Sequence, residues 1–364
     1  MLPIKRSKTA RRLSIVLAAF IVAAVALTGC GKDKENKNSA GGTTAGSTEV
    51  VATYKDGKVT RGEYDSFVGS VKFFNPMYAQ FETDPMFQDY MMKQLIAFKV
   101  LGAKADEQSK KDAETKTKQQ LDEINQYFVQ QSGDKNALDA QLKSANISQS
   151  DINDYILKSL LVLGDAEKKV TDDQVKAKYE ENAKANAYTI ATVSHVLVAL
   201  KDQNQDKDIR TKEEALKRAQ EVKQKLDGGA DFAAIAKEYS DDGGSKENGG
   251  KYENEEVGRW VEGFKKAAIE LPIGKISDPV ETEFGYHVMK VESRSSKTID
   301  EVKGEIKSEL AETEVSNFIE KDLPAMIENI DKDKLPKAEA PPAAPNAGTT
   351  PPATSDNGQQ PAAK

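Results

Sequence analysis

The chain has 364 residues, of which 38% are hydrophobic and 30% are charged. This length is enough for two domains with tails, and the composition is that of a water-soluble protein apart from one N-terminal segment. The formal net charge of −7 argues against a nucleic-acid-binding function, because binding to phosphates requires a basic surface. The single cysteine excludes an internal disulfide.

Residues 1–29 have the pattern of an export signal. Five basic residues precede a nearly uninterrupted apolar run, Leu13–Leu27, which is shorter than the roughly 20 residues that a membrane-spanning helix needs. The run ends at Leu-Thr-Gly-Cys30, which resembles the lipobox of bacterial lipoproteins. The resemblance implies cleavage before Cys30 and a lipid on its sulfur, which would anchor the chain at the extracytoplasmic face of the cell membrane. An uncleaved anchor with an incidental cysteine is the alternative.

Both ends of the remaining chain lack the apolar periodicity of a folded segment. Residues 30–48 predict a flexible spacer behind the lipid. Residues 335–364 are rich in proline and alanine and predict a disordered tail. Loss of residues 1–29, which carry five basic and no acidic residues, would change the net charge from −7 to −12. Such an acidic body suits a protein that a tether holds away from an anionic membrane.

Residues 49–185 predict a hairpin followed by a mainly helical domain. Asp56-Gly57 is a strong turn signal, and Thr60–Glu63 has the S/T-x-x-E pattern of a helix capping box. Further along, apolar residues recur at spacings of three and four, as in amphipathic helices. They form three stripes: Tyr90, Met91, Leu95, Phe98 and Leu101; Leu121, Ile124, Phe128 and Val129; and Ile152, Tyr155, Ile156, Leu160 and Leu163.

The only two histidines, His195 and His287, each lie in a short β-like apolar run. Alternate side chains of a strand point to one face of a sheet, so pairing of these runs would bring the two imidazoles to one site. A buried cross-strand hydrogen bond that only stabilises the sheet is the alternative role. Two histidines without cysteine partners argue against a zinc site, and the glycine pairs lack the G-K-[ST] ending or the strand–helix context of a phosphate-binding loop.

An ordered series of short motifs surrounds the histidines. It consists of Phe232–Ser240 (F-x-x-I-A-x-x-Y-S), Gly249-Gly250, Gly274–Val280 (G-x-I-S-x-P-V) and Phe284–His287 (F-G-Y-H). In this order the series resembles the parvulin family of peptidyl-prolyl cis/trans isomerases. The resemblance implies a parvulin-like domain at residues 186–295, with a small, mostly antiparallel sheet and surrounding helices. It also implies catalysis without a metal or a cofactor.

The resemblance assigns residues to the site. His195 and His287 match the paired histidines of the family, and Asp242 matches its cysteine or aspartate, which gives three expected catalytic residues. The expected substrate-binding residues line the proline pocket or flank the second histidine: Tyr252, Trp260, Phe264, Thr282 and Phe284. Tyr252 and Trp260 depart from the leucine and methionine of many parvulins.

Two of these assignments have plainer alternatives. Asp242 could only cap a turn beside the following glycines. Trp260 and Phe264 lie four residues apart, at helical spacing, and could be core residues of one helix.

Residues 296–334 predict a C-terminal helix with one apolar stripe. The stripe needs a partner, which we expect in the helical region before residue 185. The parvulin-like domain would then be inserted into a mainly helical chaperone domain, which gives an α+β fold. This layout resembles extracytoplasmic foldases of the SurA and PrsA type, including the PrsA-type lipoproteins of Gram-positive bacteria.

The resemblance implies an isomerase and chaperone that assists the folding of secreted proteins. Its expected partners are unfolded or nascent secreted polypeptides with X-Pro segments, and the membrane through the lipid anchor. A catalytically weak or inactive parvulin-fold holdase is the first alternative, and the departures at Tyr252 and Trp260 favour it. An assembly or adhesion lipoprotein is the second. A homodimer through the helical domain is also conceivable, but no residue pattern supports it.

Overall fold

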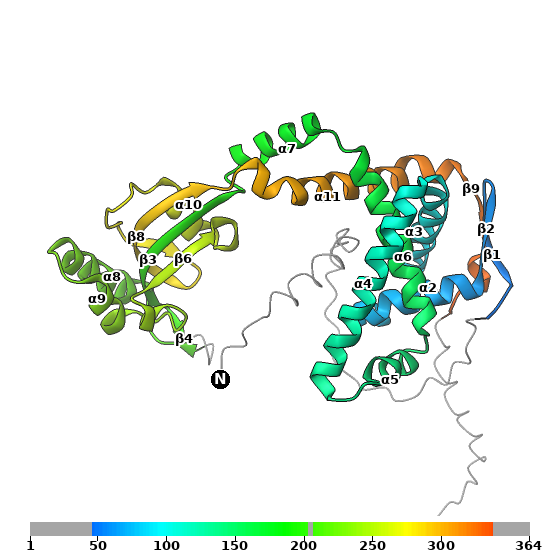
Figure 1. Cartoon of the computed structure of the whole chain (residues 1–364). Helices are drawn as coiled ribbons and strands as arrows, with labels where there is room; N and C mark the ends of the chain where they lie inside the picture. The colour runs from blue at the N-terminus through cyan, green and yellow to red at the C-terminus, as the bar shows by residue number, and fades with distance from the viewer. Residues whose placement is uncertain (1–45, 203–206, 338–364) are drawn as a thin grey trace, which may run out of the picture. The chain divides into compact units, whose positions relative to one another are not determined.

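The computed structural model describes residues 46–202 and 207–337 (Figure 1). The predicted signal peptide, Cys30, most of the spacer and nearly all of the tail lie outside the described residues. The described chain divides into two compact units: residues 101–119 and 157–320 form the first, and residues 46–100, 120–156 and 321–337 form the second. No helix in the described ranges is long and apolar enough to cross a membrane.

The second unit contains a three-stranded antiparallel sheet. Strands β1 (Val50–Tyr54) and β2 (Gly57–Thr60) form the predicted hairpin, and β9 (Ile327–Ile330) pairs with the other edge of β1. The two-residue turn falls at Lys55-Asp56, one position before the predicted pair, because Asp56 takes the left-handed conformation (φ 71°) and Gly57 already pairs with Tyr54.

Helices make up the rest of the second unit, and three of them continue into the first. The predicted capping box at Thr60 and Glu63 is confirmed, with each side chain bonded to the backbone of the other. Phe67, in the helix that follows this capping box, packs edge-on against Phe98, with ring centroids 5.7 Å apart. The helical elements are α2 (Arg61–Phe74), η1 (Pro76–Phe81), α3 (Pro85–Lys104), α4 (Glu107–Ser132), α5 (Ala137–Ser144) and α6 (Gln149–Lys169).

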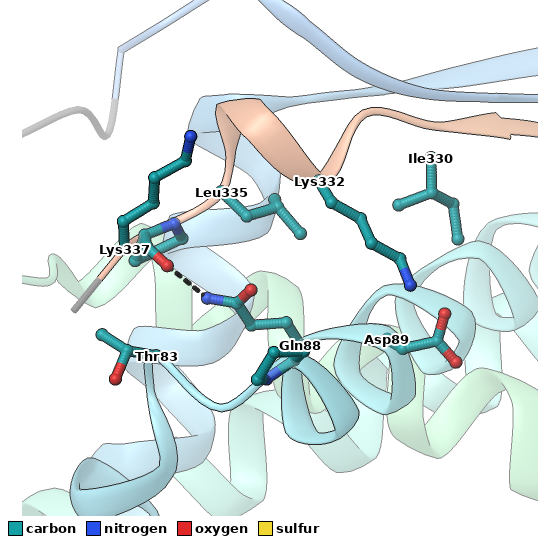
Figure 2. A pocket seen from close by; sticks show the side chains of 9 residues that line it. Thr83, Gln88, Asp89, Ile330, Lys332, Leu335 and Lys337 are labelled. Carbon is teal, nitrogen blue, oxygen red and sulfur yellow. Dashed lines mark hydrogen bonds between the residues drawn. The ribbon is translucent and has the colours of Figure 1, made fainter.

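The C-terminal segment differs from its prediction. Helix α11 (Ile299–Asn317) gives way to a π-helical turn (Phe318–Asp322), a 3-10 turn and β9, so the prediction of helix up to residue 334 is wrong beyond this point. Pro324 has no N–H for a helical hydrogen bond, which disfavours continuation of the helix. After β9 the chain packs on the start of α3, where the Gln88 amide donates to the carbonyl of Pro336 at 2.6 Å (Figure 2).

A four-stranded antiparallel sheet forms the centre of the first unit, as predicted for the parvulin-like domain. Its strand order is β6-β3-β8-β7. The two long strands pair over eleven positions and lie in the middle of the sheet. The strands are β3 (Thr189–Ala199), β6 (Lys251–Glu256), β7 (Val280–Thr282) and β8 (Gly285–Ser296).

Helices cover both faces of this sheet (Figure 1). Val196 and Val198 of β3 face α8 (Lys212–Asp227) and α9 (Phe232–Tyr239) in one apolar cluster. Val193, two residues away on the other face, belongs to a second cluster with α10 (Glu262–Glu270). The alternation of side chains along β3 therefore places odd-numbered residues, His195 among them, on the α10 face.

Helix α11 finds the partner that the sequence predicted. Its Val302 and Ile306 pack with Val175 of α7 (Asp172–Lys184) in one buried cluster. Lys178 of α7 also forms an ion pair with Glu309, with 3.1 Å between nitrogen and oxygen. The remaining short elements are β4 (Lys201–Asp202), β5 (Lys207–Asp208), η2 (Lys246–Asn248), η3 (Val257–Arg259) and η6 (Lys332–Lys334).

Candidate active site

The two histidines lie on the α10 face of the two central strands. His195 is opposite Met289 in the β3–β8 register and Leu197 is opposite His287, so the imidazoles are diagonal neighbours. Their Nδ1 atoms are 3.1 Å apart. Only 2% of His195 and 4% of His287 are exposed. The contact confirms that the two runs pair and bring the rings together.

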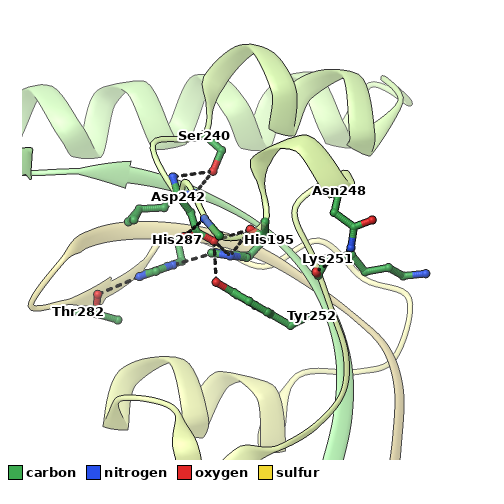
Figure 3. Close-up of polar contacts among 11 residues, drawn as sticks. His195, Ser240, Asp242, Asn248, Lys251, Tyr252, Thr282 and His287 are labelled. Carbon is green, nitrogen blue, oxygen red and sulfur yellow. Dashed lines mark hydrogen bonds and ion pairs between the residues drawn. The ribbon is translucent and has the colours of Figure 1, made fainter. Parts of the chain in front are cut away.

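Asp242 contacts the other ring nitrogen of His195. Its Oδ2 lies 2.9 Å from Nε2 of His195 (Figure 3). The same oxygen accepts hydrogen bonds from the Tyr252 hydroxyl, at 2.9 Å, and from the Ser245 hydroxyl. Three donors on one carboxylate oxygen favour the ionised form and fix its position.

The loop that follows α9 is tied to β3, and this positions Asp242. The hydroxyl of Ser240 accepts from the backbone N–H groups of Leu197 and Asp242, each at 3.2 Å. The N–H of Asp241 donates to the carbonyl of Leu197 at 2.8 Å. These bonds join the Tyr-Ser-Asp-Asp segment to the strand two residues from His195. Asp242 is therefore more than a turn cap, although its Oδ1 also accepts from the Gly244 N–H.

Gly250 allows a close approach between the loop and the histidine strand. Its carbonyl accepts from the His195 N–H at 2.8 Å. Its φ is +73°, and a Cβ here would lie 2.2 Å from the His195 carbonyl oxygen. We expect Gly250→Ala to lower the free energy of unfolding by about 2–4 kcal/mol, measured by denaturant titration. Gly243→Ala in the same loop, with no atom within 4 Å, is the control. Equal losses in the two variants would contradict this reading.

Thr282 lies behind His287, and it is not among the residues that line the cleft. Its Oγ1 is 2.9 Å from Nε2 of His287 and accepts from the N–H of Phe284 at 3.2 Å. Direct substrate contact, which the sequence predicted for Thr282, therefore has no support from the described geometry. Its hydroxyl instead fixes the orientation of the imidazole.

Thr282, His287, His195 and Asp242 form one continuous hydrogen-bonded chain (Figure 3). With both rings neutral, the threonine hydroxyl donates to His287, which donates to His195, which donates to the carboxylate. With His195 protonated, it donates at both nitrogens, and His287 donates to the threonine oxygen. The heavy-atom positions satisfy both arrangements, so a proton can be accommodated without movement of the rings.

The pKa values of the titratable groups are consistent with this series of hydrogen bonds. Burial raises the pKa of Asp242, but hydrogen bonds from His195, Ser245 and Tyr252 outweigh it and hold the pKa well below its usual value. Burial, with the nearby Asp242 charge, raises the pKa of Tyr252 to about 12. Burial, with repulsion from His195, lowers the pKa of His287 to about 3. At neutral pH the site therefore combines an ionised carboxylate, a phenol donor and a neutral His287.

A cleft of about 530 Å³ opens above the two imidazoles. The ring of Phe264 stands edge-on to both, with centroid distances of 5.1 Å and interplanar angles of 88° and 83°. Tyr252 stacks on His195 at 5.3 Å, and Trp260 lies 5.0 Å from Phe264. The lining residues are His195, Leu197, Asp242, Tyr252, Glu255, Arg259, Trp260, Val261, Phe264, Phe284 and His287.

Trp260 and Phe264, which line the cleft, do not lie on one helix. Trp260 follows the short turn η3 and lies before α10 begins, whereas Phe264 is within α10. The inference that both residues lie on one helix is therefore wrong, but their packing in the core is confirmed, because Trp260 packs against the apolar cluster that contains Phe264. Phe264 is also part of the apolar cluster under α10 and is only 4% exposed, so it contributes to the core and to the cleft.

This chain is similar to proteins of known families. The family model described as a PPIC-type PPIase domain matches residues 171–295. A foldase protein PrsA of Caldanaerobacter subterraneus subsp. tengcongensis is 30% identical over 340 residues, which are 90% of this chain and 97% of the relative. Foldase protein PrsA 3 of Bacillus cereus is 30% identical over 290 residues, 79% of this chain and 85% of the relative.

This chain belongs to the PrsA foldase family. Its PPIC-type segment makes it a peptidyl-prolyl cis/trans isomerase. Among solved structures, the crystal structure of a PrsA peptidylprolyl isomerase from Bacillus anthracis matches 65% of this chain and 94% of that chain, with 29% identity and a TM-score of 0.34.

The structure of this PrsA-family chain brings most of the predicted site residues together. His195, Asp242 and His287 form the floor, and the predicted aromatic residues line the cleft. Sequence reasoning did not assign Ser245, Glu255 or Arg259 to the site. Ser245 stands in the loop between Asp242 and Gly249-Gly250, and its spacing from Asp242 is the only sequence signal for its role. No group of three or more His, Cys, Asp or Glu side chains among the described residues could hold a metal ion.

Proposed function

We propose that this PrsA-family isomerase works at the outer face of the cytoplasmic membrane and assists the folding of secreted polypeptides. The buried His195–His287 pair beneath an apolar cleft carries the enzymatic part of the proposal. The signal-like residues 1–29 and the lipobox-like ending at Cys30 support the location. The relatives named foldase support the folding role.

The cleft suits the chemistry of X-Pro isomerisation. Rotation about the amide bond crosses a barrier of roughly 18–20 kcal/mol because it breaks resonance, and no covalent bond needs to form. Phe264 and Trp260 offer apolar ring faces to a proline ring. The fixed charge of Asp242 would disfavour the charge-separated planar amide relative to the twisted one, which lowers the barrier.

We also propose that the segments outside residues 186–295 form a chaperone domain, 49–185 with 296–334, that binds unfolded clients. Exposed apolar side chains support this role: Met77 is 70% exposed, Met86 65% and Tyr127 45%. The packing of α7 on α11, which flank the isomerase domain in sequence, supports its insertion between two parts of one domain.

A refolding experiment tests this division of roles. We expect the full chain to accelerate the proline-limited slow phase of a secreted client and to reduce its aggregation. We expect Phe264→Ala to lose the acceleration and to keep the protection from aggregation. Acceleration absent in wild type, with aggregation suppressed, would favour the catalytically weak holdase, for which the bulky Tyr252 and Trp260 walls are the supporting observation.

The proposed anchor makes a separate prediction. In cells grown with labelled palmitate, we expect the wild-type chain to carry label and to sediment with membranes. Cys30→Ser removes the only thiol and should abolish the label. Ser39→Ala in the proposed spacer is a control that should leave labelling intact. An unlabelled wild-type chain in the membrane fraction would contradict the lipid anchor.

A further inference from the structure

A β-bulge in β6 turns one carboxylate toward the cleft. Along this strand Val193 of β3 pairs with Tyr252, but Ala191 pairs with Glu255, so one extra residue stands opposite Thr192. Asn254 absorbs the extra length with φ +50°, and its N–H donates to the Thr192 hydroxyl at 3.1 Å. Without the bulge, the alternation of side chains along β6 would put Glu255 and Tyr252 on different faces of the sheet. With it, both line the cleft.

Glu255 is weakly paired for a carboxylate at the rim of an apolar cleft. Among the described residues its one ion pair is with Arg259, at 3.8 Å from Nη1 to Oε2, and its carboxylate accepts no hydrogen bond from them. Arg259 is held more closely by Glu256, with 3.2 Å between Nε and Oε2. The Arg259 guanidinium is thus shared by two carboxylates. It neutralises the charge of Glu255 only in part, so this carboxylate can pair with a cationic group of a ligand.

We propose that Glu255 is a specificity-determining residue that favours substrates with lysine or arginine next to the proline. This inference rests on the proposed use of the cleft for the proline ring. A proline seated against Phe264 puts its sequence neighbours at the rim. Among the residues that the structure describes, Glu255 and Arg259 are the only charged ones that line the cleft besides the buried Asp242. A basic neighbour can pair with Glu255, whereas an acidic neighbour meets the two glutamates that already hold Arg259.

Peptide series on the full chain test this assignment. The peptides carry Lys, Gln or Glu directly before the proline in one series and directly after it in another, and kcat/KM is measured by exchange NMR. We expect at least one series to favour Lys over Glu by about fivefold, the size typical of one half-exposed ion pair. In 1 M salt, where the Debye length falls to about 3 Å, we expect the preference to shrink toward equality.

Matched variants locate the source of the preference. Glu255→Gln should bring the Lys-to-Glu ratio close to one. Glu253→Gln, two residues earlier, exposed and paired with Lys251 at 3.1 Å, removes the same charge outside the cleft and should keep the wild-type ratio. Arg259→Gln should raise the ratio, because it releases Glu255.

The outcomes separate this inference from the proposed function. Turnover of every peptide without charge preference, or a preference that survives Glu255→Gln, overturns the role of Glu255 and leaves the isomerase site intact. No turnover of any peptide by a folded chain counts against the site itself. If Glu255→Gln fails to fold, the salt dependence of the wild-type ratio still decides, since a salt-insensitive ratio contradicts an ion pair.

Discussion

Asp242→Asn is expected to lower kcat/KM for X-Pro isomerisation by about 10²-fold, the effect of removing one preorganised charge from an active site. Asparagine keeps an acceptor oxygen for His195 but loses the negative charge. Its amide NH₂ would also face the Gly244 N–H that Oδ1 now accepts at 3.1 Å. The variant therefore tests whether the charge acts in the reaction, in addition to holding three donors in place.

Isomerisation of a neutral X-Pro peptide, followed by exchange NMR, measures this effect, with circular dichroism as a check on folding. Asp278→Asn is the matched control, because its side chain is 91% exposed and belongs to the same domain. We expect the control to retain wild-type activity. A folded Asp242→Asn chain with unchanged kcat/KM would show that the carboxylate only orders the loop.

The stability of the chain is expected to fall by about 2–3 kcal/mol between pH 7 and pH 4.5 through His287 alone. Burial lowers the pKa of this ring to about 3 in the folded chain, whereas an unfolded histidine has a pKa of about 6.5. Between these two values the unfolded chain binds one more proton than the folded chain. The free energy of unfolding therefore rises with pH across this window, by up to roughly 1.4 kcal/mol per pH unit.

Urea titrations at several pH values between 4.5 and 7 measure this slope. Above pH 4.5 most carboxylates, including Asp242 with its lowered pKa, stay ionised in the folded chain, so they contribute less to the slope. His287→Gln lacks the titrating ring and should show a flatter dependence, even though it is less stable at pH 7. An identical slope in both chains would mean that His287 is not the buried neutral group described here.

The sequence was sufficient for the features that depend on apolar alternation. His195 and His287 stand in strands whose valines alternate between two faces, so their common face follows once the strands pair. The family resemblance that the motif series carries also placed Asp242, Phe264 and Trp260 at one site. The capping box at Thr60 was predictable because it needs only residues three positions apart.

Features that depend on irregular backbone or on contacts between distant segments could not be predicted. The bulge at Asn254 moves the side chain of Glu255 to the other face of the strand. No local sequence pattern predicts a single positive φ at an asparagine. Ser245 gained its role from a loop that folds back on His195. The pairing of β9 with β1 joins residues almost 280 positions apart, which no local pattern can show. The apolar pattern of a helix continues past Asn317, so the sequence predicted a helix where the strand forms.

The most direct test is an NMR measurement of contacts between a bound X-Pro peptide and the full chain. We predict nuclear Overhauser effects from the proline ring protons to the aromatic protons of Phe264, since this ring lines the cleft and stands edge-on to both imidazoles. Proline contacts at another surface, with the Phe264 signals unperturbed while the peptide still isomerises, would contradict the assignment of this cleft as the catalytic site.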